Sequence, residues 1–208
     1  MLVGGKLLTA RSQLKKQQIL DAATELFTQH GYAISMDSIA LAANVSKQTV
    51  YAHFKTKDDL FETCIRAKCM ESQMDKLPLD DGRKPRDVLC DFAKRFQTIL
   101  RTEEAILTYR TAIRQLESHP DLAKVFVSAG PETTIEMLAQ YLSVQQQQGV
   151  LSFSISASDA AMQLLLMLHG RMVFLAQLGQ PCDMTEQEND AYIESCVDLF
   201  MTGYAAEK

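Results

Sequence analysis

Apolar residues in the first third of the chain recur with the period of an α-helix. Between Ile19 and Phe27 they stand at i, i+3, i+4, i+7 and i+8, which predicts an amphipathic helix that Gly31 ends. Ser35 is suited to cap a short second helix, which should end near Asn44, a residue that tolerates left-handed backbone angles. We expect a tight turn directly after it.

Two more helices complete the pattern of this region. Ser46 can cap a third helix, in which Val50 and Phe54 form the inward face at a spacing of i, i+4. Thr56 begins a sequence typical of a capping box, and an apolar stripe over residues 60–65 predicts a fourth, longer helix. Strand signals are absent here, so we expect this third of the chain to be entirely helical.

The rest of the chain is also predicted to be helical. The segment Leu77–Arg86, rich in proline, glycine and charge, indicates a connection between two domains. Helical patterns follow at about residues 86–101, 103–118, 131–149 and 159–178, and in a last helix that begins at a capping box of Thr185 and Glu188. The helix over 159–178 is apolar nearly all round, so it must be buried on both sides. The prediction is an all-α fold of about nine helices.

The composition is that of an ordinary globular protein. With 208 residues and 47% apolar content, the chain is long enough to bury a substantial core. No apolar stretch reaches the roughly 18 residues that a membrane span needs, so we expect none. The first ten residues lack the pattern of a signal peptide, and we expect a loose tail on a cytoplasmic protein.

The cysteines show no metal-binding pattern. They are odd in number, irregularly spaced, and contain neither a CxxC pair nor a His/Cys cluster of zinc spacing. Buried, reduced thiols are the expected state, and a thiol-based redox sensor is the alternative. We expect no metal and no cofactor. The five are Cys64, Cys69, Cys90, Cys182 and Cys196.

Charge is distributed unevenly along the chain. The net charge of −5 argues against a nucleic-acid partner, yet residues 1–70 hold nine Lys/Arg and six Asp/Glu, a balance of +3, whereas residues 71–208 carry −8. The segment 38–57 contains three lysines and no acidic residue. Any surface that faces phosphates therefore belongs to the N-terminal third.

The third predicted helix has the side chains that reading DNA requires. A major groove admits one helix, whose first residues reach the base edges. Lys47 can donate to guanine or to phosphate, Gln48 can pair with adenine, and Thr49 can hydrogen-bond a base edge or touch a thymine methyl group. The flanking residues Tyr51, His53 and Lys57 can bind phosphates, which sets the register of the helix on DNA.

The residues themselves resemble a known family. The run SMDSIALAANVSKQTVYAHFKTKDDLF, from Ser35 to Phe61, is similar to the N-terminal signature of the TetR family of bacterial regulators, and the likeness covers about residues 14–65. The resemblance implies that Lys47, Gln48 and Thr49 contact bases. It places Ser35, Ser46, Tyr51, His53 and Lys57 at phosphates.

Two departures from the family pattern are visible. Asn44 replaces the usual turn glycine, which its tolerance of left-handed angles allows. The segment from Gly31 to Ser35 is one residue shorter than usual, which puts the Ser35 contact in question. In the second half, the stretches 129–131 and 149–161 resemble the ligand-binding domain of the AefR-like branch.

The resemblance also implies the partners and the mechanism. A homodimer would pair the last two long helices of each copy as a four-helix bundle and place two recognition helices about one DNA turn apart on a palindromic operator. A small apolar or amphipathic effector would bind inside the C-terminal domain, shift the fourth helix and release the DNA. The expected organisation is a tail over 1–12, a helix-turn-helix DNA-binding domain over 13–56, a connecting helix over 57–76, and a ligand-binding and dimerisation domain over 77–208.

Candidate pocket residues follow from the inward positions of the C-terminal helices. For each one taken singly, plain core packing is the alternative. His169 stands out, because a polar group on an otherwise apolar helix needs a partner, a ligand or a water. The candidates are Phe96, Leu100, Tyr109, Ile113, Phe126, Met137, Tyr141, Met162, Leu166, His169 and Val173.

Two other classes of function compete with a DNA-binding repressor. An enzyme is not expected, because the sequence has no HExxH, no GxSxG, no phosphate-binding glycine loop and no paired carboxylates on a pocket helix. A helical adaptor that binds a protein partner is the second alternative. The repressor and the adaptor hypotheses differ in how affinity for DNA depends on salt. A repressor releases counterions from DNA and should lose DNA affinity steeply as salt rises, whereas an adaptor should show no such loss.

Overall fold

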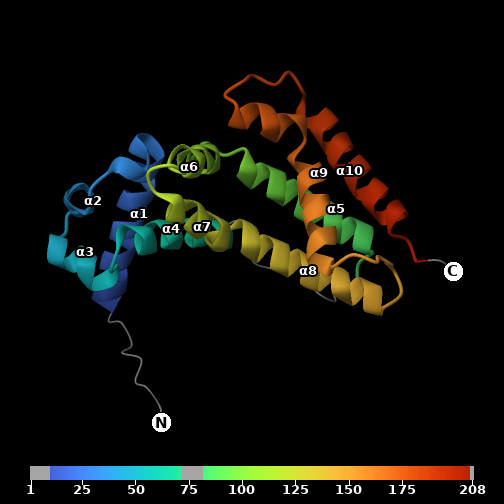
Figure 1. Ribbon diagram of the computed structural model, residues 1–208, viewed down its shortest axis with the longest axis horizontal. Helices are drawn as coiled ribbons and strands as arrows, with labels where there is room; N and C mark the ends of the chain where they lie inside the picture. The colour runs from blue at the N-terminus through green and yellow to red at the C-terminus, as the bar shows by residue number, and fades with distance from the viewer. Residues whose placement is uncertain (1–9, 72–81, 207–208) are drawn as a thin grey trace, which may run out of the picture.

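The protein is all-helical, as predicted. The computed structural model describes residues 10–71 and 82–206, and these contain ten α-helices, one 3-10 helix and a single β-bridge between Leu151 and Ala205 (Figure 1). The elements are α1 (Ala10–His30), η1 (Gly31–Ala33), α2 (Met36–Ala42), α3 (Lys47–His53), α4 (Lys57–Glu71), α5 (Pro85–Leu100), α6 (Glu103–Arg114), α7 (Pro120–Ala129), α8 (Pro131–Gln147), α9 (Ala157–Gln177) and α10 (Glu186–Gly203).

The short helices near the N-terminus begin where the capping residues predicted. The hydroxyl of Ser35 accepts from the backbone N–H of Ser38 at 3.0 Å, and the hydroxyl of Ser46 accepts from that of Thr49 at 3.1 Å. Each bond satisfies an N–H that has no partner within its helix. Asn44 takes a φ of 52°, so the turn between α2 and α3 uses the left-handed conformation expected of it.

Buried side chains form two cores. One lies among α5, α8, α9 and α10, and the other among α1 to α4, so the two groups of helices occupy opposite ends of the molecule with α6 and α7 between them (Figure 1). Leu122 of α7 is 1% exposed and belongs to the N-terminal core. α7 therefore packs into the N-terminal helices although it lies beyond them in the sequence.

α7 is the helix that the sequence pattern did not predict. The expected helix over 103–118 ends at Arg114, and Pro120 begins a new helix instead of only stopping the previous one. Proline suits a first helical turn, because its fixed φ is helical and its missing N–H would lack a partner there. Gly130 then separates α7 from α8, which begins at Pro131 as predicted.

Ion pairs connect α10 to α5. Arg86 donates to Asp198 at 2.5 Å and Arg101 donates to Glu186 at 3.0 Å, near opposite ends of the two helices. The hydrogen bond from each arginine lowers the pKa of its carboxylate partner. Exposed pairs of this kind add little to stability, so their main effect is on the orientation of α10.

α9 is interrupted in the middle. Gly170 has φ 54° and ψ −176°, a conformation outside the helical region and almost restricted to glycine. The backbone carbonyls freed before the break find side-chain donors: the Tyr192 hydroxyl donates to Met167 O at 2.7 Å, and the Gln97 amide donates to Leu168 O at 2.6 Å. α5 and α10 thus supply the hydrogen bonds that α9 loses at its kink.

Among the described residues α9 is also the one helix long and apolar enough to cross a membrane by length and composition. It packs against α8, α10 and α5, and the core helix of a globular protein meets the same criteria.

Replacing Gly170 tests whether the break is required. A Cβ at this position would lie 2.6 Å from Cε1 of Tyr192, and the positive φ strains any L-residue. We expect Gly170→Ala to lower the free energy of unfolding by at least about 2 kcal/mol in urea titrations at a fixed protein concentration. Gly203→Ala is the matched control, because its Cβ meets nothing within 4 Å. Equal stability of the two variants would show that α9 does not depend on the break.

Candidate nucleic-acid interface and internal cavity

α3 presents its N-terminal residues outward because its other face is fully buried. Val50 and Phe54 are 0% and 1% exposed in the N-terminal core and fix the rotation of the helix. Lys47 and Gln48 are exposed and Thr49 is half-buried. The three predicted base-contacting residues therefore lie together at the free end of α3, where a helix entering a groove would meet bases.

The predicted phosphate-contacting residues lie around this end. The exposed ones are Ser35, Ser46 and Tyr51, and His53 and Lys57 are half-buried. Ser35 and Ser46 use their hydroxyl oxygens as helix caps, and each hydroxyl also shares a hydrogen bond with a neighbouring hydroxyl, that of Ser38 at 2.9 Å or of Thr49 at 2.8 Å. The one-residue shortening before Ser35 leaves its capping role intact.

Lys47 is paired with an acid of the preceding helix. Its ammonium lies 2.8 Å from Oδ1 of Asp37 in the first turn of α2. The hydrogen bond to Asp37 raises the pKa of Lys47, which keeps the side chain charged. Because both groups are well exposed, the pair is weak, and a phosphate or a guanine can replace Asp37 at little cost.

Lys57 is held more firmly than the sequence suggested. Its ammonium donates to the carbonyl oxygens of Tyr32 at 2.8 Å and Ile34 at 3.1 Å, and lies 4.1 Å from the centre of the Tyr32 ring. Burial lowers the pKa of Lys57. The side chain thus joins the first turn of α4 to the segment before α2, and one of its three N–H donors is left for a phosphate.

Tyr32 is a residue whose importance the sequence pattern did not reveal. The backbone carbonyl and the ring of Tyr32 both contact the ammonium of Lys57. The Tyr32 hydroxyl donates to Asp58, and the Tyr32 ring packs edge-on against the ring of His119 at 5.7 Å. His119 is the N-cap of α7. Tyr32 therefore links the N-terminal helices to α7, a contact that depends on residues 87 positions apart in the chain.

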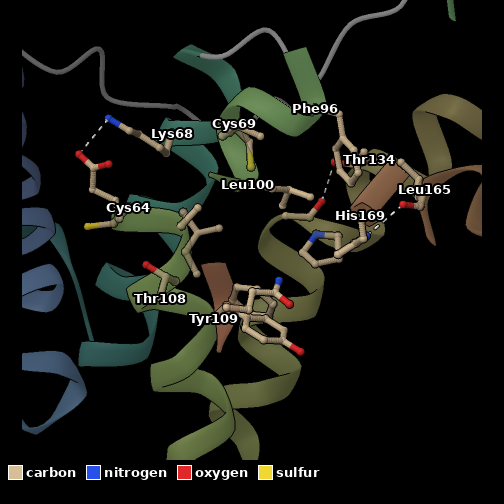
Figure 2. A pocket seen from close by; sticks show the side chains of 18 of the residues that line it. Cys64, Lys68, Cys69, Phe96, Leu100, Thr108, Tyr109, Thr134, Leu165 and His169 are labelled. Atoms are coloured by element: carbon tan, nitrogen blue, oxygen red, sulfur yellow. Dashed lines mark hydrogen bonds and ion pairs between the residues drawn. The ribbon is translucent and has the colours of Figure 1, made fainter. Parts of the chain in front are cut away.

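An internal cavity of about 300 Å³ lies between the two cores. Its wall is mostly apolar and contains residues of α1 and α4 to α9 (Figure 2). This volume is at the lower end of the range typical of small-molecule sites. Seven of the candidate pocket residues meet there: Phe96, Leu100, Tyr109, Phe126, Met162, Leu166 and His169.

The other four candidates do not line this cavity. Tyr141 and Val173 are 2% and 0% exposed and fill the space between packed helices, Met137 packs at the edge of the larger core, and Ile113 is 49% exposed. Helical periodicity gives the inward side of a helix but does not distinguish a cavity from a packed contact. Val173 also follows the break at Gly170, which ends the regular helical phase of α9.

The N-terminal helices contribute wall residues that the sequence did not indicate. Phe27 of α1 and Phe61 of α4 face the cavity, as do Cys64 and Lys68. Lys68 lies 4.0 Å from Glu104 of α6 and forms a polar border at this side (Figure 2). Because these positions are far from α5 to α9 in sequence, only the fold could bring them to the same cavity.

The cysteines are free thiols in the structure. Burial raises the pKa of Cys64 to about 11, and it also raises the pKa values of Cys90 and Cys196. Such thiols are protonated near neutral pH and react slowly, because the thiolate is the reactive form. This chemistry favours the structural interpretation of these three residues over a redox sensor.

A small helical unit that presents the N-terminus of one helix, joined to a larger helical unit with an internal cavity, defines a helix-turn-helix transcriptional regulator. Comparison with known families identifies which kind. Residues 19–64 match the model described as bacterial regulatory proteins of the tetR family, and residues 87–206 match the C-terminal domain of AefR-like transcriptional repressors. The chain belongs to the TetR family, in its AefR-like branch, and is a non-enzymatic DNA-binding regulator.

Relatives and solved structures agree with this assignment. The uncharacterized HTH-type transcriptional regulator YhgD of Bacillus subtilis is 27% identical over 155 residues, 74% of this chain and 78% of YhgD. A TetR-family regulator from Mesorhizobium loti has a TM-score of 0.79 at 25% identity, covering 95% of this chain and all of that one. The flavonoid-responsive regulator FrrA has a TM-score of 0.76 at 34% identity and covers 93% and 98%.

Proposed function

We propose that this protein is a cytoplasmic, homodimeric repressor that leaves a palindromic operator when a small apolar or amphipathic effector enters the internal cavity. The observation that carries the proposal is the cavity wall, which includes Phe27 and Phe61 of the N-terminal core as well as His169 of α9. A molecule in this cavity touches the DNA-binding helices directly. Its binding free energy can therefore depend on how those helices are placed.

The DNA contacts divide into two kinds. Lys47, Gln48 and Thr49 contact base edges in the major groove, and the surrounding residues bind phosphates. The phosphate-binding residues are Ser35, Ser46, Tyr51, His53 and Lys57. The DNA-binding unit comprises residues 13–56, and α4 (Lys57–Glu71) is the described part of the connecting segment 57–76. The effector-binding and dimerisation domain comprises 77–208, and its boundary with the connecting segment lies outside the described residues.

The dimer forms through α9 and α10. Phe174 and Leu178 are 61% and 59% exposed and lie four residues apart at the end of α9, after the break at Gly170. Leu199 of α10 is 65% exposed. Large apolar side chains gathered on two neighbouring helices are typical of a surface that a second protein covers. A two-fold axis there gives the symmetric pair of α3 helices that a palindrome requires.

Three relatives support the remaining parts of the proposal. IcaR of Staphylococcus aureus, named a negative transcriptional regulator, is 35% identical over 52 residues, and AcrR of Shigella flexneri is 47% identical over 80 residues, 36% of its length. Both likenesses are partial, and the IcaR name favours repression. FrrA is named flavonoid-responsive, which favours an aromatic effector.

Removal of Lys47 tests the DNA-binding surface. Against duplexes from upstream of the protein's own gene, we expect Lys47→Ala to weaken binding about tenfold and to reduce the slope of log affinity against log salt by about one. Fluorescence anisotropy at several salt concentrations measures both. Lys124→Ala is the control, because Lys124 is also an exposed lysine paired with an aspartate, but lies on α7. Binding that ignores salt and Lys47 alike would favour the protein-adaptor alternative.

A charge on the α9–α10 face tests the dimer. We expect Leu199→Asp to convert the dimer to monomers at micromolar concentration, because the aspartate would lose its hydration at the interface. Analytical ultracentrifugation reports the mass, and operator affinity should fall with it. Leu116→Asp, at a residue 50% exposed beyond the end of α6, should stay dimeric. A dimeric Leu199→Asp protein would place the interface elsewhere.

The effector should lower the affinity for the operator by the same factor by which the operator lowers the affinity for the effector. If the effector lowers operator affinity tenfold, the operator must lower effector affinity tenfold, because the two bindings share one thermodynamic cycle. Calorimetric titration of any cavity ligand, with and without the operator duplex, measures this factor. The same effector affinity in both titrations would contradict release by an effector.

A further inference from the structure

His169 is oriented by two contacts of its own. Its Nδ1 lies 3.0 Å from the carbonyl oxygen of Leu165, one turn earlier on α9. A carbonyl oxygen can only accept, so Nδ1 must carry a proton and donate it. The ring of Phe96 packs edge-on against the imidazole at 5.9 Å and holds it in this rotation.

The other ring nitrogen is consequently a hydrogen-bond acceptor. When Nδ1 of a neutral imidazole holds the proton, Nε2 offers a lone pair. Figure 2 shows this second ring nitrogen on the side of the imidazole that faces the cavity, away from Leu165. No group of the described chain donates a hydrogen bond to it. A partly buried acceptor in an apolar wall selects for a partner that brings a donor.

The charged groups of the wall disfavour an anion. Lys68 is the one Lys or Arg among the described lining residues, and it faces Glu104 at 4.0 Å and Glu71 at 3.5 Å. A carboxylate in the cavity would have to separate Lys68 from these acids and would meet a lone pair at His169. A neutral ligand avoids both costs.

The rest of the wall suits an aromatic ligand. Tyr109 and Phe126 meet edge-on at 6.2 Å, and Phe96 completes an aromatic lining on the side of His169. Rings of this kind offer faces and edges to a further flat ring.

We infer that the effector of this cavity is an uncharged aromatic molecule with a phenolic hydroxyl that donates to Nε2 of His169. The inference rests on the proposed function, because it assigns a ligand class and a specificity-determining residue to the same cavity. It predicts selection by hydrogen-bond direction: a donor is accepted, whereas an ether or a carboxylate of the same shape is rejected.

Four biphenyls of nearly equal size test this selection: biphenyl, 4-hydroxybiphenyl, 4-methoxybiphenyl and biphenyl-4-carboxylate. Each is titrated calorimetrically into the full-length protein at about pH 8, where an ordinary histidine is neutral. The wild type should bind 4-hydroxybiphenyl about tenfold more tightly than 4-methoxybiphenyl, and the carboxylate weakest of all.

Two variants isolate the hydrogen bond. His169→Phe keeps a flat ring but removes the acceptor, so the hydroxyl-to-methoxy ratio should fall to about one. His169→Gln places an amide oxygen near the position of Nε2 and should restore most of the ratio. A merely structural role of His169 would change the affinities of all four compounds together and leave the ratio unchanged.

The possible failures are distinguishable. If biphenyl binds but the hydroxyl gives no advantage in the wild type, or if the carboxylate binds most tightly, the assignment of His169 is overturned and the apolar effector cavity stands. If none of the four compounds binds, the inference is overturned together with the proposal of an apolar effector.

Discussion

The break of α9 at Gly170 is the constraint on which the arrangement of the larger core depends. On the observed backbone a Cβ at residue 170 would lie 2.6 Å from the ring of Tyr192, and the left-handed φ of 54° favours glycine. Before the break, α9 supplies Met162, Leu166 and His169 to the cavity. After the break, the C-terminal end of α9 packs against α6, where Arg110 donates to the carbonyl oxygens of Ala176 at 2.7 Å and Gln177 at 2.8 Å. One glycine thus lets the same helix line a cavity and close against α6.

The cavity and the DNA-binding helices are joined by packing, not by a flexible linker. Phe27 and Phe61 belong to the N-terminal core and also face the cavity, and Leu122 of α7 completes that core from the other side. Lys57 and Tyr32 hold the beginning of α4 to the segment before α2. A shift of α4 would therefore move the segment before α2 and the N-terminal core with it, because packed groups of side chains move as units.

The segregation of charge reconciles an acidic protein with a DNA partner. The excess of acid lies beyond residue 70, where carboxylates such as Asp198 and Glu186 pair with arginines of α5 and orient α10. Residues 1–70 carry a positive balance of +3, and the segment 38–57, which contains α3, has three lysines and no acidic residue. The net charge of −8 over residues 71–208 disfavours contact between DNA and this part of the chain.

Local patterns in the sequence were enough for most of the helices and for which side chains of α3 are exposed. Caps such as Ser35 and Ser46, and the alternation that buries Val50 while exposing Lys47, act over a few residues, so they can be read without knowledge of the fold. The sequence pattern did not predict α7, because a proline such as Pro120 can either end one helix or begin another. The cavity required the tertiary structure: a packed residue such as Tyr141 and a wall residue such as Tyr109 have the same pattern, and they differ only in whether another helix fills the space beside them. The partners that decide this, Phe27 and Phe61 among them, come from distant segments, and their meeting is a property of packing that no local sequence period contains.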